Sequence, residues 1–288
     1  MIGDALGASP FLSELLVTLI SVSKNYLKVG QMSSSTNSRP IVLHEPQIDS
    51  SLYASLLHDL NALCLAYGLE IEMAKLELCL RHLLYVEQVN EYINLTRITD
   101  LHDAIVLHIL DSLLLIPFLD GKSSKVLDMG TGAGFPGIPL SICCGIDSVL
   151  MDSVGKKIKA VNAFIDALHI NKAVGVHARL EEYAVSNSGA FDTVVARALA
   201  SVPVLIEYAT PFLCNGGQLV VAKGSPDDSE MESGLRAADI CGLTLIDNSD
   251  FDLPRDLGHR SVFVFEKTGA ASVKLPRTAG LAKRNPLA

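Results

Sequence analysis

The sequence lacks the cysteine spacing that zinc sites and dithiol redox centres use. Its six cysteines include no Cys-x-x-Cys pair, and the two adjacent ones, Cys143 and Cys144, lie in an apolar segment with a helical pattern. A cysteine without a surrounding motif usually behaves as a small buried hydrophobic residue. We therefore expect unpaired thiols, no metal site and a reducing, cytoplasmic compartment.

The first apolar run of the chain has the pattern of neither a signal peptide nor a membrane-spanning helix. The apolar run over residues 11–22 is short, contains Glu14, and follows Asp4 where a signal peptide would carry basic residues. A serine-rich stretch comes next, which is typical of a flexible linker. Residues 1–45 are expected to form a poorly defined N-terminal extension, with Met32 as an alternative start, and no membrane partner is expected.

Positive charge is scarce, since 23 Lys and Arg stand against 32 Asp and Glu and the net charge is −9. Proteins that bind nucleic acids neutralise phosphates with Lys and Arg, so this sum argues against such a partner. The distribution argues the other way, because residues 267–288 contain no acid and Lys156, Lys157 and Lys159 open an expected helix. Each basic group is either a phosphate contact or a solvated surface.

The order of hydrophobic patterns along the chain defines its organisation. With 49% hydrophobic residues, the chain as a whole is not disordered. Residues 51–116 carry leucines at helical spacing in two segments separated by "YGLE" (67–70), which predicts a helical cap over residues 46–118. Strand-like and helix-like runs then alternate, which predicts a doubly wound α/β domain over 119–268 and a basic tail over 269–288.

Seven strand-like runs occur in the α/β domain: "KVLDM", "SVLMD", "VGVHA", "FDTVVA", "GQLVVAK", "LTLID" and "SVFVFE". The last two are joined by residues 248–260, which lack a helical pattern and suit an antiparallel hairpin. Dinucleotide-binding folds have six parallel strands, whereas a sheet that closes with an antiparallel strand is typical of S-adenosylmethionine-dependent methyltransferases. The expected fold is a Rossmann-like class I methyltransferase with a seven-stranded, mostly parallel sheet and an N-terminal helical cap.

A glycine-rich turn follows the first strand in "VLDMGTGAGFPGIPLS", residues 126–141. Its four glycines allow backbone conformations that a Cβ forbids, and ligands of open α/β sheets bind at such a turn. "GAGFPG" fits the G-x-G-x-x-G motif that holds a pyrophosphate. Asp128, two residues before G-x-G-x-G, instead suits the sulfonium nucleotide S-adenosylmethionine, which has no phosphate. The turn alone leaves both ligands open.

Two further positions point to a nucleoside. Asp152 ends the second strand, 24 residues after Asp128, where an acid accepts hydrogen bonds from the ribose of either cofactor. The alternative role for Asp152 is a cap of the following helix. After the third strand, Leu180 and Glu181 are placed for an adenine ring to lie on an apolar side chain and donate its amino group to backbone or carboxylate. A solvated helix start is the alternative for this pair.

These motifs together resemble the family of bacterial small-subunit rRNA guanine-N7 methyltransferases, RsmG, also called glucose-inhibited division protein B. The resemblance runs from about residue 52 to the end. It rests on seven motifs in order: "NLTRI" (94–98), "HILDSLLL" (108–115), "DMGTGAGFPGIPLS" (128–141), "DSVGKK" (152–157), "ARAL" (196–199), "AKG" (222–224) and "LPRTAGLAKRNPL" (275–287). It implies S-adenosylmethionine as the cofactor and 16S rRNA or the small ribosomal subunit as the partner.

Carried over by position, the resemblance also implies roles for individual residues. The implied cofactor-binding residues are Gly130, Phe135, Leu180, Glu181 and Arg197, with Asp152 near the ribose. The residues implied to face the RNA are Asn94, His108, Asp111, Lys223 and, in the tail, Lys274 and Arg277. The sequence departs from the family pattern at Val89, where the family usually has Trp, and at Leu107, where a basic residue is common.

The chemistry of guanine N7 requires no catalytic acid or base. This nitrogen has an in-plane lone pair and no proton, so alignment of N7 with the methyl carbon and the sulfur provides catalysis, and the cofactor carries the reactive group. Arg197 is then a positioning residue that contacts the cofactor or a guanine O6. His108 lies among apolar neighbours, where a histidine is more often a core residue than a ligand or base.

The basic tail is expected to hold RNA and to leave cofactor binding unaffected. Its cations after residue 270, which no acid opposes, are Lys274, Arg277, Lys283 and Arg284. Pro276, Pro286 and Gly280 argue against an independent helix, so loss of the tail is expected to leave the sheet intact. A solvated, idle terminus is the alternative.

Three other functions stay open. A methyltransferase for a small molecule or a protein suits the acidic net charge but not the two basic groups. An NAD-type oxidoreductase rests on "GAGFPG" and is opposed by Asp128, the prolines of the turn and the final hairpin. A non-catalytic RNA-binding scaffold would be favoured by a degraded glycine turn, and this turn is intact. The sequence does not define the oligomeric state.

Overall fold

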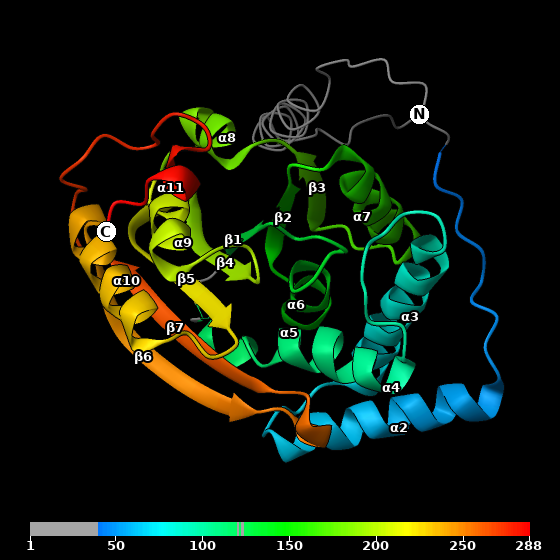
Figure 1. Ribbon diagram of the computed structural model, residues 1–288. Helices are drawn as coiled ribbons and strands as arrows, with labels where there is room; N and C mark the ends of the chain where they lie inside the picture. The colour runs from blue at the N-terminus through cyan, green and yellow to red at the C-terminus, as the bar shows by residue number, and fades with distance from the viewer. Residues whose placement is uncertain (1–39, 120, 122–123) are drawn as a thin grey trace, which may run out of the picture. The chain divides into compact units, whose positions relative to one another are not determined.

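Seven strands form one mixed sheet in the computed structural model, which describes residues 40–119, 121 and 124–288 (Figure 1). The strands are β1 (Lys125–Met129), β2 (Asp147–Asp152), β3 (Ala173–His177), β4 (Phe191–Arg197), β5 (Leu213–Lys223), β6 (Leu243–Asp252) and β7 (His259–Lys267), in the order β3-β2-β1-β4-β5-β7-β6. The first five pair in parallel, whereas β7 runs antiparallel to both β5 and β6. The predicted sheet, with its closing antiparallel hairpin, is confirmed. The predicted extension spans residues 1–45, and its residues 1–39, which include Met32, lie outside the described part of the chain.

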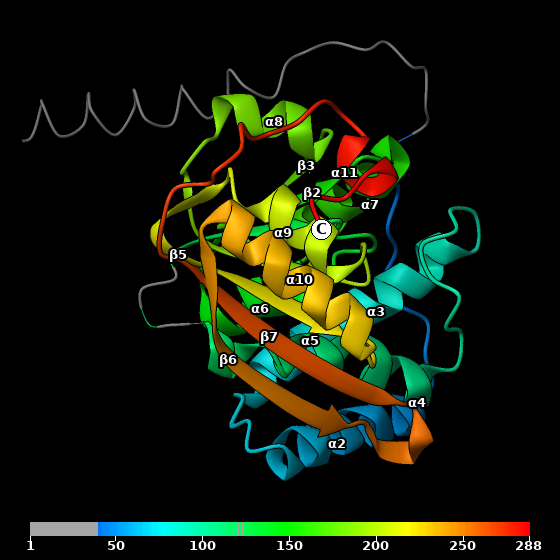
Figure 2. The same cartoon turned by 60° about the vertical axis from the view of Figure 1, so that its left-hand side comes forward.

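Alternating side chains give the sheet two covered faces. In β5, Leu219 and Val221 pack on one face while Val220 and Ala222 pack on the other. The first face is covered by α8 (Leu180–Ser186), α9 (Val202–Ala209), α10 (Asp228–Cys241) and α11 (Leu281–Arg284), and Figure 2 shows α9 and α10 in front of the strands. Helices α6 (Gly137–Cys144) and α7 (Gly155–Ala167) cover the second face. This doubly wound arrangement leaves the carboxyl ends of β1, β2 and β4 available to a ligand.

The predicted cap consists of α2 (Ser50–Ala66), α3 (Met73–Asn90), α4 (Leu101–Ala104), the π-helix η1 (Ile105–Leu110), α5 (Asp111–Leu113) and the 3-10 helix η2 (Ile116–Phe118). Helix α2 begins after Asp49, whose carboxylate accepts hydrogen bonds from the backbone N–H groups of Ser51 and Leu52. The break predicted at "YGLE" lies between α2 and α3. One apolar core joins α2, α3 and η1 to α7 and β2, and residues 41–288 form one unit.

The stretch Leu101–Phe118 passes the length and hydropathy test for a membrane span, but 67% of it is buried inside the described structure. Leu110, Leu113 and Leu115 are fully buried there. The stretch therefore belongs to the core of the described structure. Its π-helical turn carries His108, and turns of this kind are frequent at functional sites.

The chain after β7 packs on the helical layer that contains α9. At the end of β7, Lys267 donates hydrogen bonds from Nζ to the backbone oxygens of Thr210 and Leu213. Arg277 forms an ion pair with Glu207 of α9, and Ala282 of α11 is buried in the same core as α9. Arg277 of the expected tail therefore serves a tertiary contact, and the expectation that loss of the tail leaves the sheet intact stays a prediction.

Candidate functional site

The glycine turn after β1 folds back over the end of β2. The backbone N–H groups of Gly130 and Thr131 both donate to the carbonyl oxygen of Met151, at 2.8 and 2.9 Å. Gly130 has a φ of +77° and Gly134 one of +96°, a region that side chains with a Cβ rarely adopt. The turn therefore has its shape because glycine occupies these positions, and it exposes backbone beside β2 and β4.

A buried carboxylate lies directly beneath the turn. Asp128 is 1% exposed, and its Oδ2 accepts a hydrogen bond of 2.9 Å from the N–H of Gly137 at the start of α6. A Cβ on Gly137 would lie 2.7 Å from that oxygen, so glycine is required here. Burial raises the pKa of Asp128 to about 6. Dinucleotide folds hold a pyrophosphate at this helix start, and a carboxylate in its place opposes a phosphate and favours a cationic ligand.

A pocket of about 180 Å³ lies between the ends of β2 and β4 and brings together four of the predicted cofactor residues. Its lining includes Gly130, Asp152, Leu180 and Glu181. Asp152 accepts hydrogen bonds from the N–H groups of Gly132 at 3.1 Å and Val154 at 2.8 Å. Its carboxylate is thus held at the pocket edge, and the cap position of α7 is occupied by Val154 instead. We call this cavity the nucleoside pocket.

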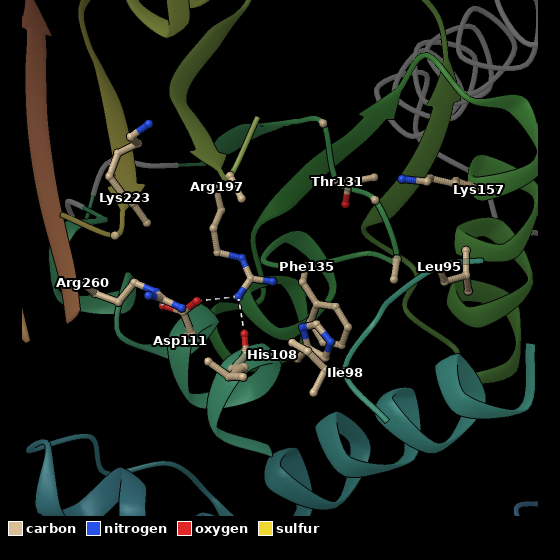
Figure 3. Close-up of a pocket in the computed structure, with 17 residues that line it drawn as sticks. Leu95, Ile98, His108, Asp111, Thr131, Phe135, Lys157, Arg197, Lys223 and Arg260 are labelled. Carbon is tan, nitrogen blue, oxygen red and sulfur yellow. Dashed lines mark hydrogen bonds and ion pairs between the residues drawn. The ribbon is translucent and has the colours of Figure 1, made fainter. Parts of the chain in front are cut away.

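A larger cleft of about 470 Å³ adjoins the nucleoside pocket, and Gly130 lines both. Besides Gly130, its lining contains five residues that the resemblance implicates: Phe135, His108, Asp111, Arg197 and Lys223. It also contains residues that the sequence analysis did not select as site residues: Leu95, Ile98, Thr131, Lys157 and Arg260. Figure 3 shows Arg197 extending from the end of β4 toward Asp111, with Arg260 close by. We call this cavity the cationic cleft.

Two arginines share one buried carboxylate at the base of the cationic cleft. Asp111 is 3% exposed, and its two oxygens accept hydrogen bonds of 2.8 Å from Nη1 of Arg197 and Nε of Arg260. Nη1 of Arg197 also donates to the carbonyl oxygen of Leu107 at 2.8 Å. The cluster thereby fixes both guanidinium groups on β4 and β7 relative to the cap, in a geometry that suits recognition of planar acceptors.

Phe135 of the glycine turn contacts two histidine rings. His108 stacks on it with ring centroids 4.7 Å apart and an interplanar angle of 9°, and His82 lies 4.5 Å away, tilted by 39°. Nε2 of His108 lies 2.8 Å from the hydroxyl of Thr96 in the "NLTRI" motif. Burial, aided by the charge of Arg197, lowers the pKa of His108 to about 4, and burial lowers the pKa of His82 to about 3. Both rings are neutral at pH 7.

The remaining predicted residues lie elsewhere or have protein partners. Asn94, Lys274 and Arg277 line neither cavity, and Arg277 is paired with Glu207. Lys223 lines the cleft, but its Nζ is 2.9 Å from Glu230 and 3.2 Å from the carbonyl oxygen of Ala200. The main residue that sequence reasoning missed is Arg260. Nothing in its local pattern relates it to Asp111, which is 149 positions away.

Fold and site together define the class of the protein, which is that of the class I S-adenosylmethionine-dependent methyltransferases. The antiparallel β7 separates this sheet from dinucleotide-binding folds, and the N–H of Gly137 at the start of α6 donates to the Asp128 carboxylate. The chain belongs to the family described as rRNA small subunit methyltransferase G, GidB, whose match covers residues 75–249.

Curated relatives agree with this membership. Ribosomal RNA small subunit methyltransferase G of Desulfitobacterium hafniense is 39% identical over 201 residues, which cover 69% of this chain and 83% of the relative. The protein of the same name from Acetivibrio thermocellus is 38% identical over 205 residues, 70% of this chain and 84% of the relative. Among solved structures, a putative methyltransferase from Bacillus halodurans aligns with a TM-score of 0.47 and 16% identity, over 56% of this chain and 100% of that chain.

Proposed function

We propose that the protein transfers the methyl group of S-adenosylmethionine to N7 of a guanine in 16S rRNA of the small ribosomal subunit, in the cytoplasm. The observation that carries the proposal is the cationic cleft beside the glycine turn. In a chain with a net charge of −9, Lys157, Arg197, Lys223 and Arg260 all line this one cavity. Such a concentration of cations suits an RNA segment, whose phosphates and guanine acceptors both attract Lys and Arg.

The nucleoside pocket suits the adenosine half of the cofactor, which supplies an electrophilic methyl group on a sulfonium when it is bound. Asp152 would accept hydrogen bonds from the ribose, and Leu180 and Glu181 would contact the adenine ring. Gly130 lines both cavities, so the two cavities adjoin at this residue. Asp128, buried two residues before Gly130, contributes negative charge beneath the glycine turn, which favours a sulfonium over a phosphate.

The cationic cleft suits guanine, because its residues orient a base and do not need to remove a proton. Arg197 uses only Nη1 for its hydrogen bonds to Leu107 and Asp111 in the described structure, so Nε and Nη2 are available to an acceptor such as guanine O6. His108 is neutral at pH 7, since its pKa is about 4, and adds no positive charge that would repel a sulfonium. Asp111 and Arg260 are positioning residues that fix Arg197. The catalytic effect is then one of alignment.

The choice of N7 is tested with RNA that lacks this atom. A transcript of the small-subunit rRNA is made once with guanosine and once with 7-deazaguanosine, which has a C–H in place of N7, and each is incubated with the protein and cofactor labelled in its methyl group. We expect label in the first transcript and none in the second. Equal labelling of both transcripts would refute N7 as the acceptor and indicate another atom or base.

A further inference from the structure

The C-terminal segment, residues 275–288, forms one wall of the nucleoside pocket. Gly280 and Lys283 line this pocket together with Asp152, Leu180 and Glu181. Figure 1 shows the segment passing α8 and returning to α11 beside α9, and α11 contacts α9. The resemblance suggested that this segment faces RNA, yet these two of its residues adjoin the cavity assigned to adenosine.

A buried ion pair anchors the segment to α9. Glu207 is 3% exposed, and its Oε1 accepts a hydrogen bond of 2.6 Å from Nε of Arg277, while its Oε2 accepts a second bond from Nη2. The same Nη2 donates to the carbonyl oxygen of Asn285 at 2.8 Å. One arginine therefore holds both ends of the segment on the helix that borders the nucleoside pocket, and Ala282 between them is 2% exposed.

A second anchor uses a predicted cofactor residue directly. Oε1 of Glu181 accepts a hydrogen bond of 2.6 Å from the backbone N–H of Gly280. Gly280 has a φ of +77°, the left-handed conformation that glycine adopts without strain. The carboxylate at the adenine end of the pocket is thus oriented by the C-terminal segment, and any ligand contact of Glu181 depends on that orientation.

We infer that the C-terminal segment is part of the cofactor site, in which Lys283 contacts the nucleoside of S-adenosylmethionine and Gly280 positions Glu181 for it. The inference rests on the proposed assignment of the pocket to adenosine. The ammonium of Lys283 is a donor for the acceptors of a ribose or an adenine ring. It follows that the segment contributes to cofactor affinity in the absence of RNA.

Calorimetry with S-adenosylhomocysteine tests this on the full chain, on a chain that ends at Ala279, and on Lys283→Ala. The matched control is Lys274→Ala, which removes an exposed lysine of the same region that does not line the pocket. We expect the truncation to weaken binding at least tenfold, about 1.4 kcal/mol, Lys283→Ala to weaken it severalfold, and Lys274→Ala to leave it unchanged. Thermal unfolding of each variant establishes that it is folded.

Equal affinity of the full chain, the folded truncation and Lys283→Ala would overturn the inference. If the truncated chain does not fold, the inference is tested by the affinity of Lys283→Ala and by hydrogen exchange of the full chain. Amides of Leu281–Arg284 are expected to exchange more slowly when S-adenosylhomocysteine is added, and unchanged exchange would also overturn the inference. Failure of the full chain to bind S-adenosylhomocysteine at all is a different outcome, because it would refute the cofactor assignment and with it the proposed function.

Discussion

The variant Asp128→Asn tests whether the buried acid beneath the glycine turn is kept for the cofactor at a cost to the fold. Asparagine has the same shape, and its carbonyl oxygen retains the acceptor for the N–H of Gly137, which lies 2.9 Å from Oδ2. The substitution removes the negative charge and replaces the buried Oδ1 by an NH2 group. Since burial raises the pKa of this carboxyl to about 6, the charged form is disfavoured by the folded protein.

The sign and size of the effect follow from linkage. Because the folded pKa is above the ordinary value of 3.8, the folded protein binds a proton more readily than the unfolded chain between these two pKa values. Ionisation of Asp128 therefore destabilises the fold progressively as the pH rises from about 4 to about 6, and the full cost persists above that. A pKa shift of about two units corresponds to about 3 kcal/mol. The unfolding free energy of Asp128→Asn is therefore expected to exceed that of the original protein by up to about 3 kcal/mol at pH 8 and by almost nothing at pH 4.

Urea unfolding of both proteins at pH 4, 6 and 8 measures this difference, and calorimetry at pH 8 measures binding of S-adenosylmethionine. We expect the variant to be more stable at pH 8 and to bind the cationic cofactor on the order of tenfold more weakly. The reasoning is refuted if the variant is less stable than the original protein at pH 8, or if the stability difference does not change with pH.

Three further outcomes are expected. Asp111→Asn leaves two arginines without their shared carboxylate, so we expect a loss of about 3–5 kcal/mol in unfolding free energy. We also expect a larger loss of methylation than of S-adenosylhomocysteine binding, and unchanged stability and activity would contradict this. Gly130→Val places a branched side chain at a φ of +77°, with its Cβ 2.6 Å from Leu199. We expect this variant to fold, to be destabilised by roughly 1–3 kcal/mol, and to lose binding of S-adenosylhomocysteine. Normal binding would show that the cofactor site is elsewhere. Because the pKa values of His82 and His108 are lowered to about 3 and about 4, the unfolded chain takes up their protons first. Stability is therefore expected to fall as the pH drops below about 6.5, by at most about 1.4 kcal/mol per pH unit for each ring. Below pH 6 protonation of Asp128 partly offsets this loss. His82→Gln should reduce by one proton the proton uptake that accompanies unfolding, and so flatten the plot of unfolding free energy against pH. An unchanged slope of that plot, measured by urea unfolding, would contradict the lowered pKa of His82.

The sheet and the nucleoside pocket were predictable because their signals are local. Each strand is a short apolar run, and the glycine turn, Asp128 and Asp152 stand at fixed distances along the chain from the strands that place them. Leu180 and Glu181 likewise follow directly from the end of β3. In parallel α/β sheets such strand ends meet at one edge, so local patterns were sufficient to bring these residues together.

The arginine cluster and the position of the tail were not predictable in this way. Arg260 meets Asp111 only because β7 inserts between β5 and β6, and no local pattern encodes a pairing across 149 positions. A basic tail without acids resembles a solvated RNA-binding arm, but the buried acid that pairs with Arg277, Glu207, lies 70 positions earlier in α9. Composition therefore described the charge of the tail and did not indicate that Arg277 pairs with Glu207.

The most direct test of the central claim is to identify the methylated product. Unmodified 16S rRNA, free and assembled into small ribosomal subunits, is incubated with S-adenosylmethionine and either the original protein or Gly130→Val, then digested to nucleosides and analysed by mass spectrometry. The account predicts 7-methylguanosine at a single site in at least one of the two substrates with the original protein, and none with the variant. Absence of methyl transfer to either substrate, or a product methylated on another base or atom, would contradict it.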